Sequence, residues 1–98
     1  MIENLIKKAN KLNPKDRKMF IDGEFEKMKQ ENKFPIIRGN DVLFVYKGEG
    51  KKVQISGDFT SWVYRLNLKR VFDTDLFYLS KKFPLDARLD YKIIVDER

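Results

Sequence analysis

The sequence has no cysteine and no histidine among its 98 residues. Without cysteine, disulfide bonds and thiolate metal sites are excluded. Small secreted domains often need disulfides, so we expect a reducing, cytoplasmic setting. Without histidine, the chain lacks the most common general base and metal ligand, and it cannot form a serine–histidine–aspartate triad. We therefore expect no enzyme activity, no metal site and no cofactor.

Long apolar runs are also missing. No apolar segment approaches the roughly 20 residues that a membrane-spanning helix needs. Residues 1–11 (MIENLIKKANK) contain neither the apolar stretch nor the small-residue cleavage site of a signal peptide. We expect a soluble chain, and its length corresponds to one domain with a modest core.

The charge is basic but evenly spread. The chain carries 21 Lys and Arg against 15 Asp and Glu, a formal net charge of +6. Residues 1–33 hold 9 basic and 6 acidic residues, and residues 34–98 hold 12 and 9, so each part has a net charge of +3. This distribution favours a lysine-rich solvated surface over a nucleic-acid footprint. A small basic nucleic-acid binder is therefore the weaker alternative, and we expect no membrane partner.

Residues 1–33 have helical spacing and predict a helical N-terminal arm. Apolar residues recur at steps of three and four over residues 2–12, as on one face of a short helix. Asn13 is a suitable N-cap and Pro14 a favoured first helical residue, which predicts a second helix from Pro14 to about Gln30. Its apolar stripe is Ile21, Phe25 and Met28. Two short amphipathic helices cannot bury both stripes alone, so they must pack on the following domain, on a catalytic domain or on another copy.

Residues 34–98 predict a domain of short strands. Apolar or alternating runs occupy residues 42–46, 53–56, 64–68, 76–79 and 91–95. Turn residues separate them at 47–51, 57–58, 73–75 and 84–88. Turn signals about every ten residues are typical of a β-sandwich or barrel.

Three of these segments resemble a known family. They are residues 56–62 (SGDFTSW), 75–79 (DLFYL) and 90–96 (DYKIIVD). The set resembles the glycogen-binding type of carbohydrate-binding module, the immunoglobulin-like early-set domain that precedes catalytic domains in isoamylases and branching enzymes. Residues 34–37 (FPII) are similar to the lead-in of the first strand in the N-terminal domain of enterochelin-esterase-like esterases. The resemblance implies a mainly β, immunoglobulin-like sandwich over residues 34–98, preceded by a pair of α-helices.

The resemblance has one departure. The family continues past the final motif into a last strand, whereas this sequence reads VDER at residues 95–98 and stops. We expect that the last strand is missing and that the chain is a truncated piece or a terminal fragment. A strand left without its neighbour would present an unpaired edge, which proteins normally avoid. We expect this edge to pair with another copy of the chain.

The resemblance also implies a carbohydrate site. It makes Trp62 a stacking platform for a glucose ring and Lys92 a donor to a sugar hydroxyl. Arg65 and Asn67 are candidates for the same face, and nothing in the sequence singles them out. The alternatives are that Trp62 caps the open end of the sandwich and that Lys92 is an exposed strand lysine.

Two further groups of residues favour a structural interpretation. The aspartates at 58, 73, 75 and 90 lie at turns, where aspartate commonly bonds backbone, rather than forming a catalytic pair. Phe72, Phe77, Tyr78 and Phe83 interleave with Lys81 and Lys82. Their alternation is typical of core residues rather than of a single-strand nucleic-acid surface.

The leading functional hypothesis is a non-catalytic accessory domain of an esterase. It would pack on a catalytic α/β-hydrolase domain, or oligomerise it. The alternative is a carbohydrate-binding module for α-glucans of the glycogen or starch type. The expected partners are accordingly a catalytic esterase domain or another copy, and in the alternative an α-glucan oligosaccharide.

Overall fold

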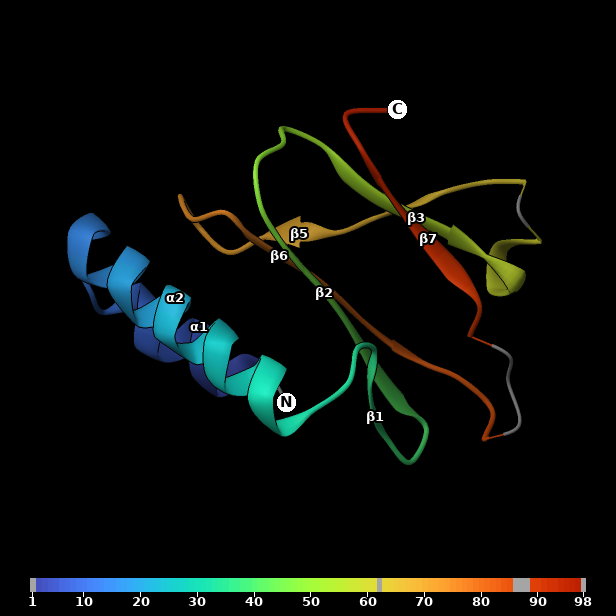
Figure 1. The fold of residues 1–98 in the computed structure, drawn as a ribbon, viewed down its shortest axis with the longest axis horizontal. Helices are drawn as coiled ribbons and strands as arrows, with labels where there is room; N and C mark the ends of the chain where they lie inside the picture. Colours follow the sequence, from blue (N-terminus) through green and yellow to red (C-terminus); the bar gives the residue numbers. More distant parts are fainter. Residues whose placement is uncertain (1, 62, 86–88, 98) are drawn as a thin grey trace.

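A computed structural model describes residues 2–61, 63–85 and 89–97, which form two helices followed by seven strands (Figure 1). Helix α1 spans Glu3–Asn10 and helix α2 spans Pro14–Glu31. Both predicted helices are confirmed. The predicted cap is also present, because the Asn13 side chain accepts a hydrogen bond from the Asp16 backbone at 2.9 Å.

The strands form two antiparallel sheets. Sheet A has the order β1-β2-β6-β5, and sheet B has the order β4-β3-β7. Sheet A consists of β1 (Ile36–Arg38), β2 (Asp41–Lys47), β6 (Leu76–Lys82) and β5 (Lys69–Arg70). Sheet B consists of β4 (Leu66–Asn67), β3 (Val53–Gly57) and β7 (Tyr91–Val95), and the short 3₁₀ helix η1 (Asp58–Thr60) follows β3. The expected strand-rich fold with two leading helices is confirmed at this level.

The sequence of strand β2 is apolar at consecutive positions because both faces of the strand are buried. Successive side chains of a strand point to opposite faces. Leu43 and Val45 belong to a core cluster with the helices, whereas Val42 and Phe44 belong to a second cluster with sheet B. Sheet A is therefore covered on both faces, and β2 cannot alternate apolar with polar residues.

The helices pack on sheet A, one of the locations expected from their unburied stripes. Their shared cluster contains Ile2, Leu5, Ala9, Ile21, Ile36, Leu43, Val45, Val71 and Leu76. Ala9 and Ile21 have no exposed surface in this arrangement. The apolar stripes of both helices thus find their contacts within the chain.

The second cluster joins residues of the two sheets and is rich in aromatic rings. Phe44 has no exposed surface, and its ring centroid lies 5.0 Å from that of Tyr91 and 6.1 Å from that of Phe83. Phe77 and Phe83 are also buried, which confirms the core interpretation for these two residues. Phe72 is 41% exposed instead, because it lies in the turn before β6 under the Arg17 guanidinium.

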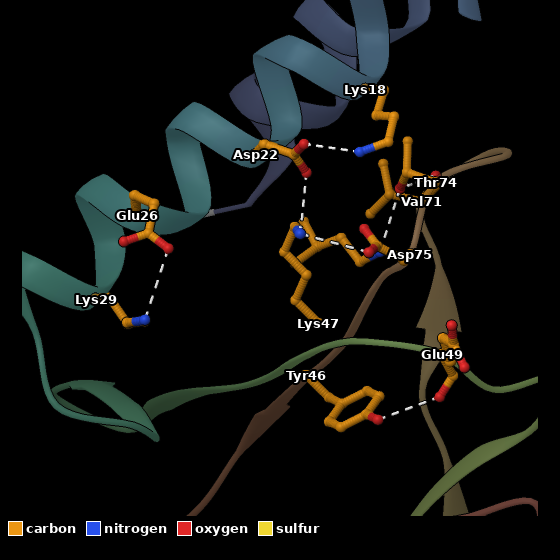
Figure 2. A network of polar contacts seen from close by, with 11 residues as sticks. Lys18, Asp22, Glu26, Lys29, Tyr46, Lys47, Glu49, Val71, Thr74 and Asp75 are labelled. Carbon is orange, nitrogen blue, oxygen red and sulfur yellow. Dashed lines mark hydrogen bonds and ion pairs between the residues drawn. The ribbon is translucent and has the colours of Figure 1, made fainter.

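Polar contacts fasten α2 to sheet A (Figure 2). Lys47 Nζ lies 3.0 Å from Asp22 Oδ1 on the helix and 3.4 Å from Asp75 Oδ2 beside β6. Asp22 also accepts from Lys18 at 2.9 Å. The hydrogen bond with Asp22 raises the pKa of Lys47, so the lysine stays charged between the two carboxylates.

Neither helix combines the length and the apolar character needed to cross a membrane within the described part of the chain.

Candidate functional site

The two residues of the expected carbohydrate site have different outcomes. Trp62 lies outside the described residues. Lys92 is exposed at the second position of β7, directly opposite Ser56 of β3. Lys92 therefore has the solvent access that a ligand contact requires.

Pair register divides the side chains of sheet B between two faces. The inner face, toward sheet A, carries Val53 and Ile55, which belong to the core cluster, with Ile93 packed against it. Residues opposite each other across two strands share a face. The outer face of sheet B therefore carries the pairs Gln54–Asn67, Gln54–Ile94 and Ser56–Lys92.

A row of polar side chains crosses this outer face. The Gln54 amide donates to Asn67 Oδ1 at 3.0 Å, and Arg65 Nη1 donates to Gln54 Oε1 at 3.5 Å. Arg65 and Asn67 thus lie on the same face as Lys92, as expected. Gln54, which joins them, was not singled out by sequence reasoning. Its position two residues before Ser56, in a strand that alternates apolar and polar, was the available signal.

The turn after β3 folds back over the same face. The Ser56 hydroxyl donates to the Tyr64 backbone carbonyl at 3.3 Å and contacts the Thr60 hydroxyl at 3.3 Å. Beyond this contact, Val63 and Tyr64 are 84% and 56% exposed. Apolar surface therefore borders the polar row on the turn that leads into β4.

Gly57 is required by a close backbone approach. A Cβ at this position would lie 3.0 Å from Tyr91 Cα and would also collide with the Asp90 carbonyl oxygen. The backbone of Gly57 is extended, so the need for glycine is steric and does not concern a positive φ. The close approach therefore holds the start of β7 tightly against the end of β3.

The arrangement can offer hydrogen bonds beside apolar surface. Lys92 and Arg65 supply cationic donors, and Asn67 supplies an amide next to them. Polyhydroxylated ligands are bound by such donors together with an apolar surface. Ser56 is 7% exposed and its hydroxyl is held by backbone, so it contributes to the turn and not to the exposed row.

Two of the turn aspartates, Asp73 and Asp75, lie against α2 and β2 instead. Asp73 Oδ1 lies 2.9 Å from Arg17 Nη1, and Asp75 lies 3.4 Å from Lys47 Nζ. The hydrogen bond from Arg17 lowers the pKa of the Asp73 carboxyl. These two carboxylates fasten the turn before β6 to the helices and to β2. In residues 2–61, 63–85 and 89–97, no three acidic side chains gather to hold a metal ion.

Comparisons with known proteins give no match, whether to a protein-family model, a curated protein or a solved structure. The family resemblance of residues 56–62 and 90–96 consequently stays a prediction.

Proposed function

We propose that the chain is a non-catalytic, immunoglobulin-like accessory domain of an esterase, which packs on a catalytic α/β-hydrolase domain or oligomerises it. The observation that supports this proposal best is the strand order. Immunoglobulin constant domains place strands A, B, E and D in one sheet and C, F and G in the other. When β4 is set aside as an extra strand, the others correspond in chain order to strands A to F. Sheet A, with the order β1-β2-β6-β5, then has the order A-B-E-D.

Sheet B supports the same assignment. Strands β3 and β7 take the places of C and F, and β4 lies on the outer side of β3. The place of strand G, on the outer side of β7, holds no strand in the part of the chain that the structure describes. An early-set domain without its last strand has this arrangement.

Exposed apolar side chains support a role in contact with another domain. Val63 and Leu85 are 84% and 80% exposed, and Tyr64 is 56% exposed. They lie on the connections that follow η1 and β6. Large apolar side chains on loops favour burial against a neighbouring protein surface, since their exposure to water is unfavourable.

The mass and the esterase activity of the native polypeptide test this proposal. An antibody raised against the chain should isolate, from the cells that make it, a polypeptide heavier than 11.7 kDa that hydrolyses p-nitrophenyl esters. The purified chain alone should give no hydrolysis above buffer. Isolation of a native polypeptide that carries these residues without a hydrolase domain, and with no esterase in complex with it, would contradict the proposal.

The second candidate is α-glucan binding, and the polar row beside Lys92 favours it. We expect a malto-oligosaccharide to quench Trp62 fluorescence, and glycogen in a gel to retard the chain. Trp62→Ala and Lys92→Ala should each reduce the retardation. Lys81→Ala, at an exposed lysine of sheet A, is the matched control and should not. Binding that collapses with added salt would instead indicate phosphate contacts and the nucleic-acid alternative.

A further inference from the structure

Exposed apolar side chains gather at one end of the two sheets. Ile37, Val63, Tyr64 and Leu85 are all more than half exposed. Ile37 belongs to β1, Val63 and Tyr64 follow η1, and Leu85 follows β6. We call this region the η1 end, and it comprises residues 36–41, 58–61, 63–65, 80–85 and 89–92. It lies on the side of the molecule away from the α1–α2 turn (Figure 1).

Backbone hydrogen bonds join the segments of the η1 end to one another. The Phe83 amide donates to the Asn40 carbonyl at 2.8 Å, which ties the end of β6 to the β1–β2 turn. The Asp58 amide donates to the Asp90 carbonyl at 3.1 Å, which ties η1 to the residue before β7. The ring centroids of Phe59 and Phe83 lie 5.2 Å apart and link η1 to the end of β6. The segments therefore form one connected surface.

The exposed side chains after η1 stand on hydrogen-bonded backbone. The Val63 amide donates to the Thr60 carbonyl at 3.1 Å, and the Tyr64 carbonyl accepts from the Ser56 hydroxyl at 3.3 Å. Thr60 and Ser56 are both buried. A surface whose backbone is already held loses little conformational entropy when a partner binds it.

Sheet A is left open at the η1 end. Ile37, Val42 and Lys81 form one row across β1, β2 and β6. Residues opposite each other share a face, so Ile37 lies on the face that Val42 turns toward sheet B. Val42 is 2% exposed, whereas Ile37 is 56% exposed. Sheet B therefore covers the middle of this row and leaves Ile37 for another surface to cover.

Basic residues border these apolar side chains. The η1 end includes the basic residues Arg38, Arg65, Lys81, Lys82 and Lys92 and the acidic residues Asp41, Asp58 and Asp90. Lys82 pairs with Asp41 at 2.8 Å. Within the described part of the chain, Arg38, Lys81 and Lys92 form no ion pair. A partner surface that matches the η1 end is therefore apolar at its centre and acidic at its border.

We propose that the η1 end is the surface on which the catalytic domain packs, through an apolar patch bordered by carboxylates. This inference rests on the proposed function, because the catalytic domain is taken from it. It adds which surface of the chain makes the contact and which chemistry the partner brings.

The other faces of the chain offer less for such a contact. The apolar stripes of the helices are already buried on sheet A. The outer face of sheet B carries the polar row of Gln54, Asn67 and Arg65. Elsewhere among the described residues, the exposed large apolar side chains are Met19 and Phe72, and Phe72 lies under the Arg17 guanidinium. Burial of apolar surface therefore favours docking at the η1 end.

Photo-cross-linking in the native polypeptide locates the contact. Leu85→p-benzoylphenylalanine places a photoreactive group at the η1 end, and the same change at Met19, which is exposed on α2, is the matched control. Mass spectrometry should find cross-links from position 85 to peptides of the hydrolase domain, and several times fewer from position 19. Equal yields from both positions would overturn the proposal, and so would cross-links from position 85 only to a second copy.

Charged substitutions test the contact by stability. Leu85→Asp should leave the thermal midpoint of the 98-residue chain unchanged, because this side chain is exposed, and should lower the midpoint of the native polypeptide. Lys81→Glu should also lower the midpoint of the native polypeptide, and added salt should shrink its effect. Lys11→Glu, at an exposed lysine beyond α1, is the control and should lower neither midpoint. An unchanged midpoint of the native polypeptide with Leu85→Asp would overturn the proposal.

The docking surface and the proposed function can fail separately. A native polypeptide that hydrolyses p-nitrophenyl esters without cross-links from position 85 leaves the proposed function standing and overturns the docking surface. A native polypeptide with no hydrolase attached or bound overturns both.

Discussion

The Thr60 hydroxyl closes the turn after β3 by bonding both backbone groups of Gly57. It accepts from the Gly57 amide at 3.0 Å and donates to the Gly57 carbonyl at 2.9 Å. Thr60 is only 1% exposed, so water cannot replace these bonds. The turn that carries the exposed Val63 and Tyr64 thus depends on one buried hydroxyl.

Thr60→Val should destabilise the protein, because the change keeps the shape and removes the hydroxyl. A buried backbone group left without its partner costs about 1–3 kcal/mol. Thr60→Ser keeps the hydroxyl and loses one methyl group, so it should cost less. Urea denaturation measures both. Equal losses for the two variants would show that packing, and not the hydrogen bonds, holds the turn.

Two glycine substitutions should act in opposite directions. Gly57→Ala forces the start of β7 away from β3, since the added Cβ meets backbone atoms of residues 90 and 91. Such overpacking costs about 1–3 kcal/mol. Gly23→Ala adds a Cβ with nothing within 4 Å in the interior of α2 and should stabilise the protein by up to about 1 kcal/mol. Thermal unfolding followed by circular dichroism measures both, and a stable Gly57→Ala variant would contradict the close approach.

Arg17→Ala should loosen the helices from the turn before β6. Its side chain is 15% exposed and bonds the Ala9 and Leu12 carbonyls at 2.8 and 2.9 Å, in addition to Asp73. Hydrogen bonds from a charged group contribute about 1.5–3 kcal/mol, and we expect a loss in that range in urea denaturation. Lys18→Ala is the control, because Lys18 is 68% exposed and its ion pair contributes about 0.5 kcal/mol or less. Similar losses for both variants would rule out a special role for Arg17.

Stability should decline in acid partly through Asp22. A hydrogen bond from Lys18, and to a smaller extent one from Lys47, lowers the pKa of this carboxyl below its ordinary value of 3.8. The stability that Asp22 contributes is therefore fully present above about pH 4 and is lost as the pH falls through the lowered folded-state pKa. Asp22→Asn should weaken the protein at neutral pH and less at about pH 3, below the ordinary pKa of 3.8. Urea denaturation at both pH values measures the difference, and an equal effect at both would contradict the assignment.

The helices and the longer strands could be predicted because local signals agree with the final structure. Asn13 and Pro14 mark the start of α2, and the dense apolar run of residues 42–46 lies within β2. β5 could not be predicted, because Lys69 and Arg70 carry no strand pattern. They are held as a strand only by pairing with Tyr78 and Phe77 of β6. The predicted strand at residues 64–68 is reduced to the two residues of β4, because its beginning belongs to the turn that covers Ser56.

The candidate site was predictable only in part. Lys92 was selected through a motif, whereas Arg65 and Asn67 were candidates that nothing in the sequence singled out. Gln54 and Thr60 were missed. Their importance comes from contacts with residues 3 to 13 positions away, and sequence spacing does not specify which way each side chain turns.

The sequence by itself determined the two helices and the longer strands, because helix caps, apolar spacing and turn residues act within a few positions of the chain. It also determined the chemistry available, since a chain without histidine or cysteine offers no imidazole and no thiol. The tertiary structure alone decided that sheet A would be covered on both faces, by the helices and by sheet B. It also left the outer edge of β7 without a strand among the described residues. Both follow from which strands pair and which faces meet, and pairing depends on contacts between residues far apart in the chain.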